Sequence, residues 1–366
     1  MTQNNFANTI KGNHYLLAKS MKIIELDGDS IRDAVDARDR YDLLLASQRE
    51  ARHSYGGSMK FETRGDVEYL IRRPFGSSSR KSLGRRSSET EQKLAMFSEG
   101  KARAEERVFS LRKQLEERAP ILRARGLGRV PTLPARVMRK LDDLGWLGTS
   151  LVVLGTNALY AYEAKAAVRI ETSMLATGDV DVLYDARRRL VMSGEVNKNG
   201  LVGALKAVDK SFERSKNKSY TASNKDGYMV DLLEPRDHDR IMRKGPAQLS
   251  DDPEDLIATT TESSKWLLNV PKFTATVFDE RGLPLRITTI DPRVYALQKQ
   301  WIVENDTTRD PAKRVRDEQQ AQVVATIATK HLGLNFDDTA LSGLPASFRR
   351  LAGRFDLTGD DSPPEW

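Results

Sequence analysis

The chain has 366 residues, enough for about two domains of ordinary size. Hydrophobic residues make up 39% and charged residues 30%, a balance that supports a packed core and excludes a disordered chain. Because there is no cysteine, disulfides, cysteine-ligated zinc, iron–sulfur clusters and thiol nucleophiles are excluded. The four histidines show no metal-ligand spacing, which leaves carboxylates as the natural metal ligands.

Positive charge is concentrated in the first part of the chain. Residues 1–145 carry 29 Lys and Arg against 20 Asp and Glu, whereas the remainder carries 30 against 32. This excess favours an anionic partner, nucleic acid or nucleotide phosphates, although a basic soluble surface has the same composition. Residues 1–20 lack the apolar stretch of a signal peptide, and no window is apolar enough to span a membrane. We therefore expect a cytoplasmic protein with no membrane partner.

Residues 1–145 read as a basic, mainly helical region with a short hairpin. A helix is predicted over Ser30–Arg52 with Ser30 as its N-cap, and a hairpin over Met59–Ile71 that turns at Arg64-Gly65-Asp66. The Ser/Gly-rich segment Phe75–Ser88 is predicted to be a loop. A long helix follows over Glu89–Arg118, ended by Pro120, and a short one over Ala135–Leu144.

Residues 146–290 alternate between strands and helices, and residues 291–357 read as a helical region followed by a flexible tail over 358–366. The predicted pattern is that of an α+β fold with a small mixed sheet flanked by helices. Its predicted elements are strands Leu151–Leu154, Val180–Tyr184, Ser219–Ser223, Tyr228–Leu233, Phe273–Asp279 and Leu285–Ile290, and helices Ala158–Val168, Leu201–Arg214, Pro292–Glu304 and Pro311–Leu332.

A glycine turn follows the first buried strand of the central region. Gly155-Thr156-Asn157 stands between the strand and the next helix, where backbone N–H groups can face an anion such as phosphate. Glycine is also common in such turns for steric reasons alone. Asn157 is expected either to cap the helix or to touch nucleotide.

Two acids alternate on the second central strand. Asp179 and Asp181 project to the same side of a strand, with Val180 and Val182 facing the core. Two such carboxylates repel, and a divalent cation removes the repulsion; hard oxygen ligands suit Mg²⁺ or Mn²⁺. The alternative is a surface strand with solvated acids. Asp231 is a third acid in the apolar strand Tyr228–Leu233, where an unpaired carboxylate is costly to bury.

Together these residues resemble the nucleotidyltransferase fold of the DNA polymerase beta superfamily. That pattern is a hydrophobic strand, Gly followed by Gly or Ser, an acid-x-acid strand and a third acid on a later strand. Here Gly155-Thr156 departs from it only by Thr in the second position, which keeps a hydroxyl. The chain is also similar to a family of bacterial nucleotidyltransferase-fold proteins, in the segments GTNALYAYEA (Gly155–Ala164), ATGDVDVL (Ala176–Leu183), RKSLGRRSSETE (Arg80–Glu91), and DPRVYALQKQW (Asp291–Trp301) with KRVRDEQQA (Lys313–Ala321).

The resemblance implies that residues 146–290 form a nucleotidyltransferase catalytic core. Asp179 and Asp181 would hold two magnesium ions, Asp231 would ligate the catalytic one and help activate the attacking hydroxyl, and Gly155 and Thr156 would cradle the β- and γ-phosphates. In-line attack on the α-phosphorus of an NTP would then transfer a nucleoside monophosphate and release pyrophosphate. The acceptor could be RNA such as tRNA, a protein, or a small molecule.

Several basic residues are further candidates for nucleotide binding. Arg80 and Lys81 stand in the predicted Ser/Gly loop, which could close over a triphosphate, touch a nucleic-acid backbone or simply be solvated. The resemblance suggests that Lys299 and Lys313 lie on a wall of the cleft, although most helical Lys residues are surface residues. Asp317 follows Lys313 by four residues, the spacing of a simple helical ion pair.

Two other functions stay open from the sequence. One is a catalytically silent nucleotidyltransferase-fold module that binds nucleic acid or a protein, which the three clustered acids argue against. The other is a two-metal phosphodiesterase or nuclease that uses the same carboxylates for hydrolysis. Few histidines, and a glycine turn before an acid-x-acid strand, favour transfer.

Overall fold

A mixed β-sheet forms the centre of the computed structural model, which describes residues 23–76, 78–185, 200–235, 247–261, 266–355 and 357. Its strand order is β5-β13-β14-β6-β8-β11-β10-β9, and β12 pairs with the end of β11. These strands are β5 Gly128–Val130, β6 Leu151–Leu154, β8 Asp179–Tyr184, β9 Glu213–Arg214, β10 Thr221–Ser223, β11 Met229–Pro235, β12 Thr259–Thr261, β13 Lys272–Asp279 and β14 Pro284–Ile290. Parallel and antiparallel pairs both occur, so the predicted α+β fold with a mixed sheet is confirmed.

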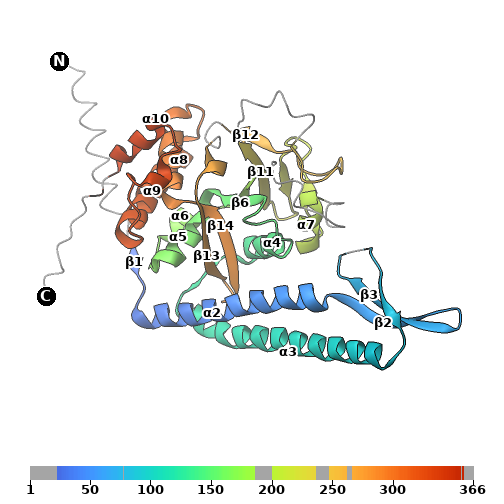
Figure 1. Ribbon diagram of the computed structural model, residues 1–366. Helices are drawn as coiled ribbons and strands as arrows, with labels where there is room; N and C mark the ends of the chain where they lie inside the picture. Colours follow the sequence, from blue (N-terminus) through green and yellow to red (C-terminus); the bar gives the residue numbers. More distant parts are fainter. Residues whose placement is uncertain are drawn as a thin grey trace, which may run out of the picture.

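Helices surround this sheet (Figure 1). They are α4 Thr132–Asp143, α5 Leu159–Ala166, α6 Thr172–Leu175, α7 Gly200–Val208, α8 Pro292–Asn305, α9 Pro311–Thr326 and α10 Ala346–Arg349. The helices α8 and α9 pack against each other, and each begins with a proline in its first turn. Asp291 and Asp310 precede them and accept hydrogen bonds from their first N–H groups, which explains the sharp helix starts. We refer to the sheet and these helices as the body.

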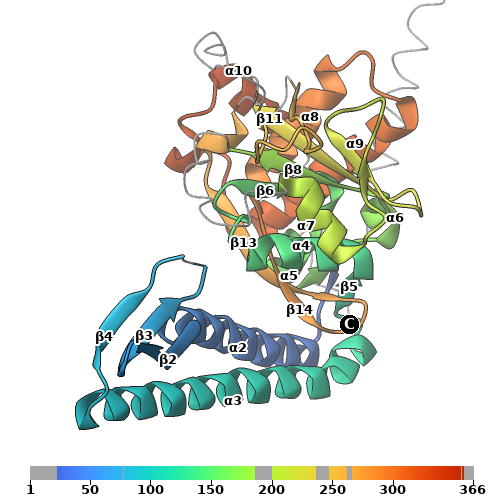
Figure 2. The ribbon, with the colours of Figure 1, turned by 90° about the vertical axis from the view of Figure 1, so that its right-hand side faces the viewer.

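A long helical hairpin, here called the arm (residues 28–124), lies beneath the body and carries a small sheet at its far end (Figures 1 and 2). Its helices are α2 Gly28–Glu50 and α3 Ser88–Ala124, and its strands are β2 Gly57–Arg64, β3 Val67–Pro74 and β4 Lys81–Arg85. Tyr41 and Leu44 of α2 pack against Leu111 and Leu115 of α3. The arm is therefore held together by its own apolar contacts as well as by the body.

The arm is joined to the body at both of its ends and also packs on it along α2, where Ala34 and Ala37 meet Phe278 of β13. The elements β5 and α4 precede residue 146, where the sequence predicts that the catalytic core begins. They nevertheless belong to the body, because β5 pairs with β13 and α4 packs on β14. On the other side of the arm, β1 (Ile24–Glu25) pairs with β7 (Val168–Arg169). Both ends of the arm are thus tied to the central sheet or its neighbours.

Three details of the arm differ from the sequence prediction. Asp27, not Ser30, caps α2: its carboxylate accepts the Ser30 N–H at 2.7 Å. The helix α3 continues past Pro120, because Pro120 and the carbonyl of Glu116 that it leaves unpaired are on the exposed side, while Ala119 and Leu122 are buried.

The third difference is β4, which lies inside the segment predicted to be a loop. Lys81 pairs with Arg72 and brings a polar strand to the edge of the small sheet. Edge strands are commonly charged, so composition alone does not distinguish them from loops. The predicted hairpin before it is confirmed, with β2 and β3 joined at Gly65.

In the body, the predicted strands at 219–223 and 228–233, and those at 273–279 and 285–290, form two antiparallel hairpins, and one helix is shorter than predicted. The turn Asn224–Gly227 joins β10 to β11, with Gly227 at φ +80°. The helix α7 ends at Val208, since the chain turns at Asp209 and buries Phe212 before β9. The helix after Gly155 begins as a 3₁₀ turn (Gly155–Ala158) before α5.

No helix in the described part of the chain is long and apolar enough to cross a membrane. The predicted tail over 358–366 and the first 22 residues, which include the segment judged not to be a signal peptide, lie outside the described residues.

Candidate active site

The structure brings the three predicted acids together on two adjacent strands. β8 and β11 are parallel, and their register sets Asp181 beside Asp231 and Asp179 beside Met229. The intervening residues Val180, Val182, Val230 and Leu232 are fully buried. The apolar positions therefore hold both strands in the core, and the period of two in a strand places all three carboxylates on the opposite face.

Burial makes this acidic face electrostatically unfavourable. Burial, together with the charges of Asp179 and Asp231, raises the pKa of Asp181 to about 7. Burial also raises the pKa of Asp231, again helped by Asp179. The Oδ1 atom of Asp231 is buried without a hydrogen-bond partner in the described structure. A bound cation would reduce the repulsion between the carboxylates and give Asp231 Oδ1 a partner.

The carboxylates are chemically suited to a divalent cation, but they do not form a ready-made three-ligand centre. Hard oxygen donors on neighbouring strands, one of them unsatisfied, fit Mg²⁺ or Mn²⁺. Among the described residues, however, no three His, Cys, Asp or Glu side chains are grouped closely enough to hold a metal ion. The Asp179 carboxylate instead accepts a hydrogen bond from the Thr177 hydroxyl.

Gly155 lies directly against the carboxylate of Asp181. It follows β6, which pairs with β8 so that Leu154 faces Asp181. The backbone of Gly155 has φ +62°, and a Cβ atom there would overlap Asp181 Oδ2. Glycine is thus needed twice, for the left-handed backbone and for the close approach of the carboxylate.

Thr156 and Asn157 are buried and contact the protein interior. The Thr156 hydroxyl accepts a hydrogen bond from Gln320 Nε2 of α9 at 3.3 Å. Asn157 does not cap the helix: its Nδ2 donates to the Asp179 carbonyl at 2.8 Å, which ties the turn to the start of β8. Of the three turn residues, Gly155 lines the cleft beside the acids.

That cleft has a volume of about 670 Å³, within the range of small-molecule sites. The acids Asp181 and Asp231 line it together with the cations Lys299 and Arg309, whose charges lower the pKa of Asp181 against the larger effect of burial. Further lining comes from the strands β11 and β12, from α8 and from the segment after α8, with residues Leu154, Gly155, Tyr220, Leu233, Thr259, Thr260, Thr261, Gln298, Trp301, Ile302, Asn305, Asp306 and Thr307.

One buried carboxylate holds both cations of this wall. Asp317 of α9 is fully buried and lies 2.6 Å from Lys299 Nζ and 2.7 Å from Arg309. The alternative that Asp317 only pairs with Lys313 on its own helix is therefore wrong: among the described residues its ion pairs go to α8 and to the segment before α9. Two cations share one anion, so the group keeps a net positive charge beside the cleft.

The other predicted basic residues lie outside the cleft. Lys313 is exposed at the start of α9, and its charge lowers the pKa of Asp231 against the larger opposite effect of burial. Arg80 and Lys81 are at β4, far from the cleft at the end of the arm (Figures 1 and 2), and Arg80 pairs with Glu62 there. The structure does not bring Arg80 and Lys81 to the predicted nucleotide site, because strand pairing holds their segment on the small sheet.

Sequence reasoning missed Arg309 and Gln320. Arg309 follows α8 in an irregular segment that no periodicity singles out. Gln320 lies within the segment Lys313–Ala321 that carries the resemblance, but nothing in its spacing indicated a contact with Thr156, 164 residues away in the chain.

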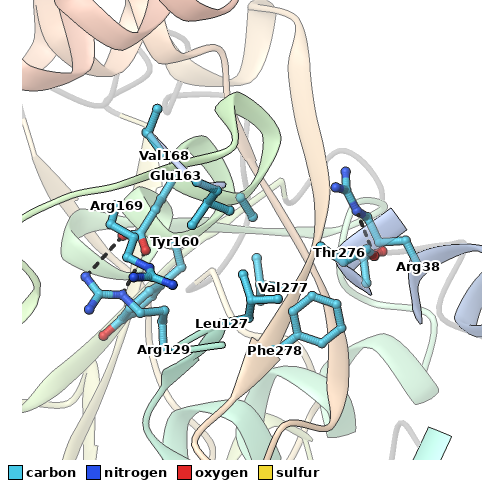
Figure 3. A pocket seen from close by; sticks show the side chains of 14 residues that line it. Arg38, Leu127, Arg129, Tyr160, Glu163, Val168, Arg169, Thr276, Val277 and Phe278 are labelled. Atoms are coloured by element: carbon cyan, nitrogen blue, oxygen red, sulfur yellow. Dashed lines mark hydrogen bonds and ion pairs between the residues drawn. The ribbon is translucent and has the colours of Figure 1, made fainter. Parts of the chain in front are cut away.

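A second cavity, shown in Figure 3, lies where the arm meets the body. Arg129 pairs with Glu163 at 2.8 Å on one side of it, and Arg38 of α2 lies on the other. Its volume of about 40 Å³ has room for only a few water molecules. Most of its lining is apolar, including Leu127, Val277 and Phe278, so it is a small gap in the packing between arm and body, and the cleft described before it is the better candidate for a substrate site.

Comparison with known proteins gives one match. A family model described as nucleotidyltransferase matches residues 133–344, which is more than half of the chain. The matched part contains the glycine turn, the three acids, the cations of the cleft and Asp317. No curated protein and no solved structure matches.

The close contact between Gly155 and Asp181 gives a first prediction. Gly155→Ala adds a Cβ that overlaps the carboxylate and strains a left-handed backbone, so we expect at least tenfold weaker binding of a fluorescent ATP analogue. Gly178→Ala is the matched control, because Gly178 lies next to the acids but its Cβ would meet nothing within 4 Å. Equal binding by both variants would contradict the proposed role of the contact.

The raised pKa of Asp181 gives a second prediction. Between about pH 4 and 7 the folded chain keeps a proton at Asp181 that the unfolded chain has released. The free energy of unfolding therefore falls as the pH rises over this range, and the contribution of Asp181 is fully lost once the pH has passed 7. Asp181→Asn cannot ionise and should raise the free energy of unfolding in EDTA at about pH 8, by up to about 4 kcal/mol. Urea denaturation measures it, and the gain should shrink as the pH falls. A loss of stability at about pH 8 would refute the argument.

The ion pairs of Asp317 give a third prediction. Asp317→Asn leaves Lys299 as a buried cation with a weaker partner and should destabilise the fold by about 3–5 kcal/mol in urea denaturation. Lys313→Ala is the control and should change stability by less than about 0.5 kcal/mol. Comparable losses in the two variants would instead favour a pair along α9.

Proposed function

Since the chain belongs to this nucleotidyltransferase family, we propose that its cleft binds a nucleoside triphosphate and transfers the nucleoside monophosphate to an acceptor hydroxyl. The observation that carries the proposal is the pairing of an acidic floor with a basic wall. Asp181 and Asp231 form the acidic floor and line the same cleft as Lys299 and Arg309, which form the basic wall, and Gly155 of the glycine turn lies against Asp181.

The basic wall is suited to the triphosphate. Lys299, Arg309 and Asp317 together keep one positive charge, and Lys299 is itself buried, so its interaction with a phosphate is weakly screened by water. Lys299 acts as a point charge, whereas the guanidinium of Arg309 has further donors for phosphate oxygens.

The acidic floor is suited to the reacting centre. Asp181 and Asp231, which line the cleft, would hold a divalent cation, Mg²⁺ or Mn²⁺, and Asp179 would join them once its carboxylate leaves the Thr177 hydroxyl; such a cation neutralises charge on the phosphate oxygens. The acceptor oxygen forms a bond to the α-phosphorus while the bond to the bridging oxygen breaks, and pyrophosphate leaves with that electron pair. Asp231, whose pKa is raised, is placed to accept the proton of the attacking hydroxyl.

The acceptor is proposed to be RNA, for example a tRNA, with a protein or small-molecule hydroxyl as the alternatives. The described chain carries its basic excess on the arm, away from the cleft, where a mononucleotide bound in the cleft would not use it. A polymeric acceptor can reach both places.

The test is transfer of label from NTPs labelled at the α-phosphate to total RNA, with Mg²⁺ or Mn²⁺. We expect labelled RNA and released pyrophosphate, and a loss of at least a hundredfold in rate for Asp181→Asn and for Asp231→Asn. Asp226→Asn is the matched control, since Asp226 is an exposed acid in the turn just before β11.

Other outcomes assign other functions. Label on the protein itself would make the acceptor a protein hydroxyl. Free monophosphate or shortened RNA, lost in the same Asp variants, would favour a two-metal phosphodiesterase. Failure to bind any nucleotide or metal at millimolar concentration would refute the enzyme and leave a silent binding module.

A further inference from the structure

The small sheet at the end of the arm carries a cluster of positive charge that the cleft does not use. Residues 57–86 contain eight Lys and Arg against three Asp and Glu. The register pairs Lys60 with Ile71, Arg64 with Val67 and Arg85 with Tyr69, which sets these three cations on one face of the sheet. Lys60, Arg64 and Arg85 are all exposed. We call them the arm cations.

The acids of this sheet are already engaged elsewhere. Glu62 accepts hydrogen bonds from both Arg73 and Arg80, and Glu68 pairs with Arg86. Within the described chain, no ion pair is made by Arg64 or Arg85, and Lys60 is 4.0 Å from Glu62. Glu62 and Glu68 are therefore paired mainly with Arg73, Arg80 and Arg86, and the arm cations stay available to an external anion.

The position of the sheet indicates the size of that anion. The helix α3, at 37 residues, is about 55 Å long, and the sheet stands at the end remote from the body (Figure 2). A nucleotide bound in the cleft cannot touch the arm cations, whereas a long polyanion can contact both. The aromatic ring of Tyr69, half-buried beside Arg85, adds a surface on which a base can stack.

We infer that Lys60, Arg64 and Arg85 on the arm's small sheet bind the phosphate backbone of RNA. The charges lie along strands of a polar sheet and not along the polar side of an amphipathic helix, which suits a phosphodiester chain better than a membrane surface. Binding itself needs neither NTP nor metal; that this RNA is also the acceptor rests on the proposed function.

The test is fluorescence anisotropy of the full chain with a fluorescein-labelled RNA hairpin that has a single-stranded 3′ end, without NTP or divalent cation. We expect the triple variant Lys60→Glu/Arg64→Glu/Arg85→Glu to bind at least tenfold more weakly. The slope of log Kd against log salt should fall by about two to three, because each lost phosphate contact removes roughly one unit. Lys60→Gln/Arg64→Gln/Arg85→Gln should show the same loss in smaller degree, and circular dichroism checks that both variants fold.

The matched control changes the same amount of charge on the body. Lys165, Lys206 and Lys210 are exposed there, and the triple change of these residues to Glu should leave RNA affinity within about twofold. Equal losses in the arm and body variants, or unchanged affinity and salt slope in both arm variants, would overturn the inference. Binding of the arm to phosphatidylserine vesicles with no RNA binding would overturn it in favour of a membrane surface.

The two proposals fail separately. An arm that binds RNA in a chain that transfers no label would leave the RNA surface standing and remove the enzymatic role. Label transfer that is undiminished in the arm variants, together with unchanged RNA affinity, would leave the enzyme standing and remove the RNA surface.

Discussion

The mutual repulsion of Asp179, Asp181 and Asp231 is the constraint around which the body is built. Ionising Asp181 in the folded chain costs up to about 4 kcal/mol, as its pKa of about 7 indicates. The same two strands bury Val180, Val182, Val230 and Leu232, and each such side chain contributes about 1.5–3 kcal/mol. Apolar burial on one face of β8 and β11 therefore outweighs the electrostatic cost on the other, which permits the chain to fold with its acids close together.

The basic wall of the cleft, formed by Lys299 and Arg309, needs a negative partner in the same way that the acids need a cation. A buried Lys299 would be costly alone, and Asp317 offsets that cost through a short ion pair. Because Asp317 also binds Arg309, the wall stays positive and is fixed in position by α8 and α9. Gln320, one turn further along α9, reaches Thr156 in the glycine turn. The helix α9 thus connects the basic wall to the turn that touches Asp181.

The acidic half of this site could be predicted from the sequence because it depends on local rules. Alternation along a strand puts Asp179 and Asp181 on one side, and a glycine before the helix marks a close approach. The basic half could be predicted only in part: the resemblance indicates Lys299 on the cleft wall, but its partner Asp317 lies on another helix, and the i+4 spacing favours Lys313 as the partner of Asp317. The place of Arg80 and Lys81 could not be predicted for a related reason: charge and composition do not reveal that their segment pairs with β3.

The separation of arm and cleft gives the charge distribution of the chain a physical meaning. If the basic excess of residues 1–145 bound a triphosphate, its cations would line the cleft. The cations of the cleft are instead Lys299 and Arg309, which belong to the nearly neutral residues 146–366. Much of the excess lies instead on the small sheet at the end of the arm, none of whose residues lines the cleft. Two separate cationic surfaces bind either two anionic ligands or one long one. If the chain joins a nucleotide to RNA, as we propose, both anions must be bound at once, and the arm would then distinguish the polymer from a small acceptor.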